Sequence, residues 1–281
     1  MDAKENRQLQ ILACKVRMGA IEGVYRAKSG HPGGSLSAAD LLTYLYFREM
    51  RVNPEHPKAE NRDRFVLSKG HGAPGLYATL ALKGYFPMAE LKKLRHIGAM
   101  LQGHPDMKGT PGVDMSTGSL GQGFSAACGM ALAGKMDRME YRVYTLLGDG
   151  EIEEGEIWEA AMFAGHHHLD NLCAIVDSNG LQIDGPVAQV AGPAPIDEKF
   201  RAFGFDVQII DGHDFGAMEK AMKHAKSVKD QPCAIIAQTV KGKGVSYMEN
   251  QVSWHGKAPN DEQYAVAMQD LNRTLSELEA E

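Results

Sequence analysis

The sequence predicts an α/β fold, a doubly wound and mainly parallel sheet with helices on both faces. Two short apolar runs, 143–147 and 172–176, have the composition of buried parallel strands, and each ends in small or polar residues. Helical spacing over 156–166 between them completes a strand–helix–strand unit. Two more apolar runs follow, at 207–210 and 234–239. Strands that alternate with helices favour a parallel sheet between helical layers.

The other elements follow from spacing and from residues that start or break helices. Residues 8–25 have helical spacing, and Ser37 can cap a helix that runs to residue 47. Residues 276–281 form a charged tail for which solvation is the expected role. We further predict a strand at 65–68 and helices at 74–82, 88–100, 121–136 and 215–227.

Composition narrows the class of protein. The 281 residues are 43% hydrophobic and 23% charged, which suits one large domain over 1–281. The net charge of −6 is spread without a basic stripe, so we expect no nucleic-acid partner. No signal core or membrane-spanning run is apparent, so we expect no membrane insertion and a cytoplasmic location. Cysteines without a C-x-x-C pair indicate buried free thiols at Cys14, Cys128, Cys173 and Cys233.

Polar residues follow the two central strands where each one ends. Gly148-Asp149-Gly150 follows the first, and Asn179 comes thirty positions after Asp149, beyond the second. Ligands of open α/β sheets bind at the carboxyl ends of the strands. A carboxylate and an amide oxygen suit Mg²⁺, which usually binds through few protein groups and the phosphates of a substrate. The sequence therefore predicts a divalent-cation site that holds a phosphate group.

Four histidines lie next to glycine or proline in separate segments. They are His31 in Ser-Gly-His-Pro-Gly-Gly-Ser, His71 after an apolar strand, His104 in Gly-His-Pro, and His255 in Trp-His-Gly. One histidine of this kind is usually an ordinary loop residue. Four of them together with the cation motif indicate a site that handles protons or phosphate, because imidazole titrates near neutral pH.

The order of these segments resembles the transketolase family, and the Gly148-Asp149-Gly150 motif with Asn179 resembles its thiamine diphosphate motif. The resemblance runs from about residue 19 to residue 259 and covers the diphosphate-binding domain that opens a transketolase. It implies a thiamine diphosphate-binding fold, with thiamine diphosphate and Mg²⁺ (or Ca²⁺ or Mn²⁺ in its place) as cofactors. It also implies transfer of a two-carbon ketol unit from a ketose, or its phosphate, to an aldose or its phosphate.

The pyrimidine-binding and C-terminal domains of a transketolase have no counterpart in these residues. The resemblance therefore implies an N-terminal subunit of a split transketolase, active only with a separately encoded C-terminal subunit. Since each cofactor of a transketolase lies between two protomers, we expect two copies of each subunit. The Gly/Ala-rich segment 121–136 suits close packing against the sheet or against another chain.

The resemblance also implies a role for each site residue. Asp149, Asn179 and the Leu181 carbonyl would bind the metal, and the Gly150 amide would face the diphosphate. His71 and His255 would contact phosphate, while His31, His104 and His255 would handle protons at sugar hydroxyls. The remaining residues near the cofactor would be Gly118 and Leu120 beside its rings, Ile183 against the thiazolium, and Glu154, with Glu159, in a carboxylate network between cofactor sites.

Several charged residues and histidines have a second possible role. Acidic residues suit the dipole at a helix start, which is the expected role of Glu151, Glu153 and Glu156 and an equal alternative for Glu154 and Glu159. Lys241, which replaces an apolar residue of some transketolases, lies in a loop that is either solvated or closes over the diphosphate. His166-His167-His168 is better explained by the C-terminal end of a helix than by metal binding.

Two alternative functions also stay open. One is a subunit of another thiamine enzyme, namely a sugar-specific ketol transferase, a deoxyxylulose-phosphate synthase or a 2-oxo-acid dehydrogenase. The other is a non-catalytic scaffold that keeps the fold. The segments around His31, His104 and His255 favour sugar chemistry over oxo-acids.

Overall fold

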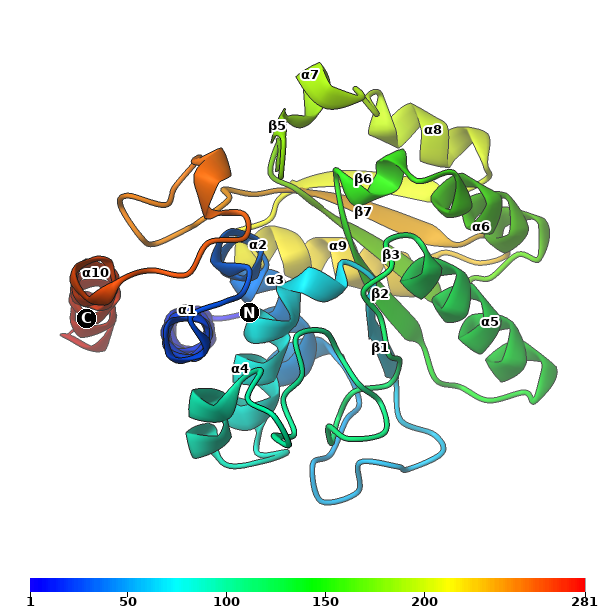
Figure 1. Cartoon of the computed structure of the whole chain (residues 1–281). Coiled ribbons are helices and arrows are strands. Elements are labelled where there is room, and N and C mark those ends of the chain that lie inside the picture. The colour runs from blue at the N-terminus through cyan, green and yellow to red at the C-terminus, as the bar shows by residue number, and fades with distance from the viewer. Residues whose placement is uncertain (281) are drawn as a thin grey trace.

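The structure is a computed structural model that describes residues 1–280, and its centre is a parallel sheet (Figure 1). The strand order is β1-β2-β3-β7-β6, and all neighbouring strands are parallel. This confirms the predicted α/β class. The strands are β1 (Arg64–Leu67), β2 (Val143–Gly148), β3 (Leu172–Ser178), β6 (Asp206–Asp211) and β7 (Cys233–Gln238).

Helices cover both faces of the sheet, and the side chains of each strand alternate between the two faces. On β2, Tyr144 and Leu146 point into one core, whereas Val143 and Leu147 point into the other. Figure 1 shows the two helical layers. The first core packs under α1 (Ala3–Ala27), α3 (Ala39–Tyr44), α4 (Ala73–Lys83) and α9 (Phe215–Ser227), and the second under α5 (Gln122–Met136), α6 (Gly155–His166) and α8 (Ile196–Ala202).

Short elements connect the strands and the longer helices. A two-stranded antiparallel hairpin of β4 (Leu181–Gln182) and β5 (Gly185–Pro186) follows β3. The other short elements are α2 (Pro32–Ser37), α7 (Val187–Val190), a π-helical turn at Leu45–Glu49, and 3-10 turns at Gly70–Gly72, Met88–Lys93, Glu151–Glu153 and Val252–Trp254.

Two predictions from the sequence were wrong. Ser37 ends α2 instead of capping a helix, and its hydroxyl donates to Asp177 Oδ2 at 2.6 Å. The predicted helix at 88–100 is only the 3-10 turn Met88–Lys93, because Arg95 and Gly98 have φ of 62° and 77°, which no right-handed helix allows. The predicted charged tail at 276–280 is mostly exposed, as expected, and it forms the last part of α10 (Asp261–Ala280); residue 281 lies outside the described residues.

The C-terminal helix α10 packs on α1 and closes a third, smaller core (Figure 1). Leu271 of α10 is 1% exposed, and its carbonyl accepts a hydrogen bond from Cys14 Sγ of α1 at 3.2 Å. The outer face of α10 carries many charged residues, so its buried apolar positions are difficult to recognise in the sequence. All four cysteines are free and buried, as predicted. Among residues 1–280, no helix has both the length and the apolarity to cross a membrane.

Candidate active site

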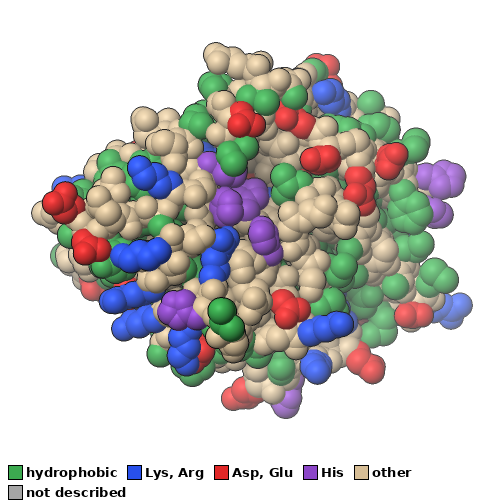
Figure 2. All heavy atoms as spheres, in the orientation of Figure 1, with side chains coloured by type: hydrophobic (Ala, Val, Ile, Leu, Met, Phe, Trp, Pro, Cys, Tyr) green, Lys and Arg blue, Asp and Glu red, His purple; other side chains and the backbone are tan. Residues whose placement is uncertain are grey.

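The predicted site residues meet in a cavity of about 100 Å³ at the carboxyl edge of the sheet. The segments that follow β1, β2, β3 and β7 form its walls, together with α2 and the turn that carries His255. Figure 2 shows histidine side chains gathered at the centre of this hollowed face. Eight of the predicted residues line the cavity: His71, Leu120, Asp149, Gly150, Asn179, Leu181, Ile183 and His255.

The three predicted metal ligands lie at the ends of neighbouring strands. Gly148 of β2 pairs with Asp177 of β3, so the segments after both strands lie side by side. Asp149 is 3% exposed, and its carboxylate accepts from the amides of Gly150 at 3.0 Å and Gly180 at 2.5 Å. Asn179 Oδ1 accepts from the Leu181 amide at 3.1 Å. The turn therefore gathers a carboxylate, an amide oxygen and a backbone carbonyl.

This oxygen set fits a hard divalent cation. Burial is the largest cause that raises the pKa of Asp149 to about 6, and the negative charge of Asp177 is the next. The ionised form of this carboxylate is therefore disfavoured, and the positive charge of a bound cation would stabilise it. No group of three or more histidine, cysteine, aspartate or glutamate side chains in the described part of the chain could hold a metal. A cation here would use few protein ligands, which suits Mg²⁺ with a phosphate.

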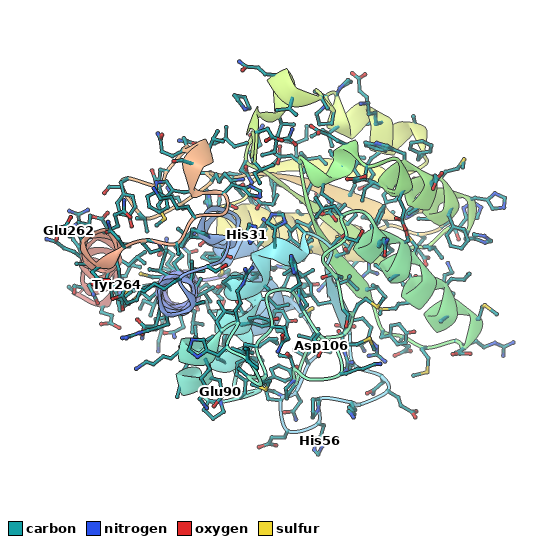
Figure 3. The ribbon with its side chains drawn as sticks, viewed as in Figure 1. His31, His56, Glu90, Asp106, Glu262 and Tyr264 are labelled. Carbon is teal, nitrogen blue, oxygen red and sulfur yellow. The ribbon has the colours of Figure 1, made fainter. Side chains whose placement is uncertain are left out.

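The four histidines come from four distant segments and form one cluster. The ring centroid of His31 lies 5.4 Å from that of His71, 5.5 Å from that of His255 and 6.5 Å from that of His104. The ring centroids of His71 and His255 are 5.0 Å apart. Figure 3 labels His31 where α2 begins, near the carboxyl edge of the sheet. Rings at these separations are in or near contact, so the four imidazoles form one contiguous group.

Burial keeps this cluster neutral. Burial is the largest cause of the low pKa values of His31, about 4, and His255, about 3. Neighbouring cationic side chains lower both pKa values further. The pKa of His71 lies well below 6.5, and that of His104 is also lowered. His31 Nδ1 is buried without a hydrogen-bond partner. The site therefore offers neutral imidazoles, each with one donor and one acceptor nitrogen.

Two buried lysines in the cavity wall were not predicted as site residues. Lys69 is 1% exposed; its ammonium donates to the Gly34 carbonyl at 2.8 Å and forms an ion pair with Asp177. Lys241 is 2% exposed and donates to the Leu181 carbonyl at 2.8 Å, with His255 Nδ1 at 3.0 Å. Of the two interpretations of Lys241, solvation is therefore wrong, and closure of its loop over the diphosphate stays a prediction. The position of Lys241 directly after an apolar strand run was the available signal.

The buried lysine also sets the state of its histidine neighbour. Burial, followed by the charge of Lys69, lowers the pKa of Lys241 to about 8, so its ammonium form prevails at neutral pH. An ammonium only donates, so His255 Nδ1 accepts and Nε2 carries the hydrogen. The cavity floor thus has a cationic patch beside the oxygen ligands, which suits a diphosphate.

Comparison with known proteins identifies this arrangement. Residues 9–274 match the family model described as "Transketolase, thiamine diphosphate binding domain". The chain belongs to the transketolase family. It is 47% identical to the 6-deoxy-6-sulfo-D-fructose transketolase subunit SqwG of a Clostridium species. The alignment extends over 271 residues and covers 96% of this chain and 98% of that relative. The chain is 42% identical over 273 residues to one subunit of the apulose-4-phosphate transketolase of Phocaeicola vulgatus, with 97% of each chain covered.

Longer transketolases share the same fold. The Campylobacter jejuni transketolase structure superposes with a TM-score of 0.89 at 34% identity, over 99% of this chain and 46% of that one. Human transketolase is 45% identical over 257 residues, which cover 91% of this chain and 41% of the human protein. The chain thus spans about half the length of these transketolases. It spans nearly all of the two subunits.

Two glycines and one exposed apolar residue lie beside the cavity or the histidine cluster. Gly118 has φ of 147°, and a Cβ there would lie 3.0 Å from His104 Cγ, so the position requires glycine. At Gly150 a Cβ would lie 2.6 Å from Gln182 Oε1. Ile183 on the hairpin is 62% exposed and leaves an apolar side chain open above the cavity.

The acidic residues after β2 divide into two groups. Glu151 is 2% exposed and accepts from Ser68 Oγ at 2.6 Å and from the amides of Gly121 and Gly148, both at 3.0 Å. The expectation that it serves a helix dipole was wrong, because it ties three segments of the site together. Glu154 and Glu159 are exposed at the start of α6 and stay outside the cavity lining. Their predicted contact across a dimer stays a prediction.

Proposed function

We propose that this chain is the diphosphate-binding subunit of a two-subunit ketol transferase that moves a two-carbon unit between sugars. The observation that supports this most strongly is the meeting of His31, His71, His104 and His255 beside the oxygen set of Asp149. The near full-length match to two transketolase subunits supports the view that this chain works with a separate partner.

Thiamine diphosphate would occupy the cavity with a divalent metal ion. When bound, it supplies an electron sink for breaking a carbon–carbon bond next to a carbonyl, which side chains do not supply. Asp149, Asn179 and the Leu181 carbonyl would hold the metal. The Gly150 amide, His71 and Lys241 would face the diphosphate, and the remaining residues near the cofactor would be Gly118, Leu120, Ile183 and His255.

The histidines at the mouth would act on the substrate. His104 is exposed, so it can exchange protons with solvent, whereas His31 and His255 are half-buried. We assign proton transfer at a sugar hydroxyl to His104. His31, whose Nδ1 lacks a partner, and His255, whose Nε2 carries a hydrogen, would orient hydroxyls and complete the proton path.

The partner would carry the pyrimidine-binding and C-terminal domains. Two copies of each subunit would place every cofactor between unlike chains, and the two-fold axis would make the central contact isologous. The exposed residues Met136 at 74%, Met162 at 58% and Phe163 at 38% on α5 and α6 suit such a contact.

A donor screen with the reconstituted complex tests this proposal. The chain would be co-expressed with a C-terminal transketolase subunit from the same genome, then assayed with thiamine diphosphate and Mg²⁺. The donors would be 6-deoxy-6-sulfo-D-fructose, apulose 4-phosphate and a ketopentose phosphate, since related subunits carry the first two names. We expect transfer from at least one donor. Failure of all ketoses with an assembled, cofactor-loaded complex refutes ketol transfer, and turnover of a 2-oxo acid would favour the dehydrogenase alternative.

A further inference from the structure

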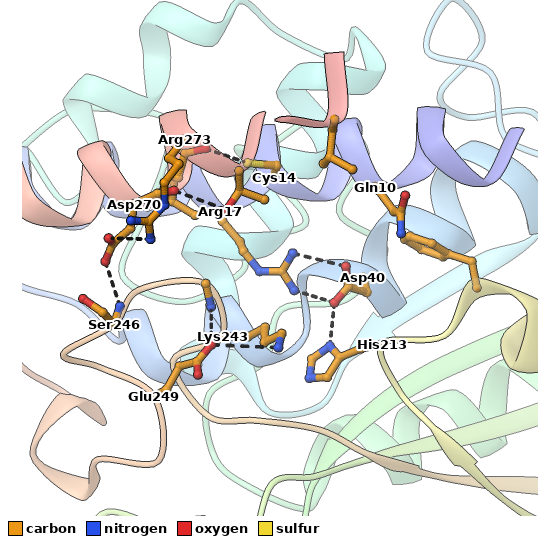
Figure 4. Close-up of a pocket in the computed structure, with 15 residues that line it drawn as sticks. Gln10, Cys14, Arg17, Asp40, His213, Lys243, Ser246, Glu249, Asp270 and Arg273 are labelled. Carbon is orange, nitrogen blue, oxygen red and sulfur yellow. Dashed lines mark hydrogen bonds and ion pairs between the residues drawn. The ribbon is translucent and has the colours of Figure 1, made fainter. Parts of the chain in front are cut away.

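A second cavity of about 490 Å³ lies behind the site, between α1, α10 and the segment after β6 (Figure 4). His213 follows β6 and lines this cavity. Its ring lies between two partners: Asp40 Oδ2, 2.6 Å from Nδ1, and the amide of Val240, 2.9 Å from Nε2. An amide only donates, so Nε2 accepts and Nδ1 carries the hydrogen that is donated to Asp40.

Asp40 fixes the other end of this imidazole. The carboxylate is 6% exposed on α3 and accepts from Arg17 Nη1 at 3.2 Å and from Nη2 in a two-pronged ion pair (Figure 4). Burial opposes its ionisation, but the charge of Arg17 and the hydrogen bonds outweigh burial, and the pKa of Asp40 is lowered. Because Asp40 stays ionised, its carboxylate can only accept hydrogen bonds. It therefore holds His213 in one tautomer and one orientation.

The Val240 amide connects this network to the active site. Val240 precedes Lys241, whose ammonium reaches the Leu181 carbonyl and His255. The next residue, Gly242, donates to the Gly33 carbonyl of α2 at 3.0 Å. The peptide that carries Lys241 is therefore held on one side by α2 and on the other side by His213.

We propose that His213 is a positioning residue for the active site: held by Asp40 and Arg17, it orients the Val240–Lys241 peptide and so the Lys241–His255 pair. This inference rests on the proposed function, because it assigns Lys241 and His255 to the cofactor and substrate. Arg17, Asp40 and His213 line only the second cavity and act through Val240, without touching the site cavity.

Three variants separate this role from simple stabilisation. His213→Leu removes both hydrogen bonds. His213→Gln keeps one donor and one acceptor at similar positions and does not titrate near neutral pH. Phe215→Leu is the matched control, because Phe215 is 2% exposed in the same cavity and its ring has no polar atom that could hold the Val240 amide.

The first measurement uses the full chain alone, labelled with ¹⁵N-histidine. We expect a neutral His213 with hydrogen on Nδ1. His213→Leu should shift the ring signals of His255 but leave those of the distant surface residue His168 in place, and His213→Gln should restore them. Phe215→Leu should leave His255 unchanged. Unchanged His255 signals in His213→Leu overturn the proposal, whatever its activity.

The second measurement is ketol transfer by the complex with the partner subunit. In His213→Leu we expect kcat/KM to fall roughly ten- to hundredfold, as when groups that orient ligands are lost, with most of the activity recovered in His213→Gln. A loss no greater than in a Phe215→Leu variant of equal thermal stability overturns the positioning role. If the wild-type complex transfers no ketol unit, the proposed function fails, but the ring signals still decide the link from His213 to His255.

Discussion

Asp149→Asn should make the metal-free chain more stable while it abolishes cofactor binding. Burial raises the pKa of Asp149 from 3.8 to about 6, a difference that corresponds to about 3 kcal/mol against the charged form in the folded state. The amide removes this charge. It accepts only one of the two hydrogen bonds from Gly150 and Gly180, which costs about 1–1.5 kcal/mol. The net gain is about 1.5–2 kcal/mol at pH 7.

The sign of the pH dependence follows from the raised pKa. Between pH 3.8 and about 6 the folded chain holds a proton on Asp149 that the unfolded chain has released, so wild-type stability falls as pH rises. Above about 6 the full penalty is present, and below 3.8 it is gone. The advantage of Asp149→Asn should therefore be largest at pH 7 and shrink markedly by pH 5.

Thermal unfolding in EDTA and calorimetry with thiamine diphosphate and Mg²⁺ test both halves. The gain corresponds to roughly 3 °C in Tm at pH 7 for a domain of this size. Asp184→Asn is the matched control, because Asp184 is exposed, on the β4–β5 hairpin; neither measurement should change. Wild-type cofactor affinity in Asp149→Asn refutes the metal assignment. A lower Tm at pH 7 shows that the buried charge does not carry the predicted penalty.

The other predictions concern proton transfer, the buried lysine and assembly. His31→Ala and His104→Ala should lower turnover roughly a hundred- to ten-thousand-fold with little change in cofactor affinity; a variant that keeps turnover but loses the cofactor, seen by calorimetry, has been assigned the wrong ligand. Lys241→Met should weaken thiamine diphosphate binding and raise the pKa of His255, which stays below 6.5 because burial remains its largest cause; an NMR titration with an unchanged His255 contradicts this. The isolated chain should be inactive and bind the cofactor weakly, and addition of the partner should produce a heterotetramer and activity together in light scattering and a coupled assay. Robust turnover by the chain alone rules out the split-subunit model.

Local pattern accounts for most of what the sequence predicted correctly. The runs that became β2 and β3 are apolar on both faces because both faces are covered, and such runs are recognisable without knowing what covers them. Asp149 and Asn179 were identifiable because parallel strands end at one edge, so residues far apart in the chain meet there. The order of the histidine segments identified the family because it resembles the order found in transketolases, and the family match confirms this.

Elements whose stability depends on distant partners escaped sequence reasoning. Residues 276–280 look like a solvated tail, but they continue a helix that Leu271 anchors against α1. Residues 94–100 have helical composition, yet Arg95 adopts a left-handed conformation while its guanidinium donates to Ser29 Oγ at 2.8 Å and its amide donates to the Leu101 carbonyl. In both places tertiary contacts outweigh local preference.

The sequence by itself determined the α/β class, the placement of Asp149 and Asn179 at neighbouring strand ends, and the identity of the four histidines. Only the tertiary structure decided the charge state of the site. Glu151, Lys69 and Lys241 read as surface charges in the chain, yet each is at most 2% exposed and hydrogen-bonded to a distant segment. The physical reason is that burial and charge pairing depend on which segments surround a side chain, and a linear pattern of residues does not record those neighbours.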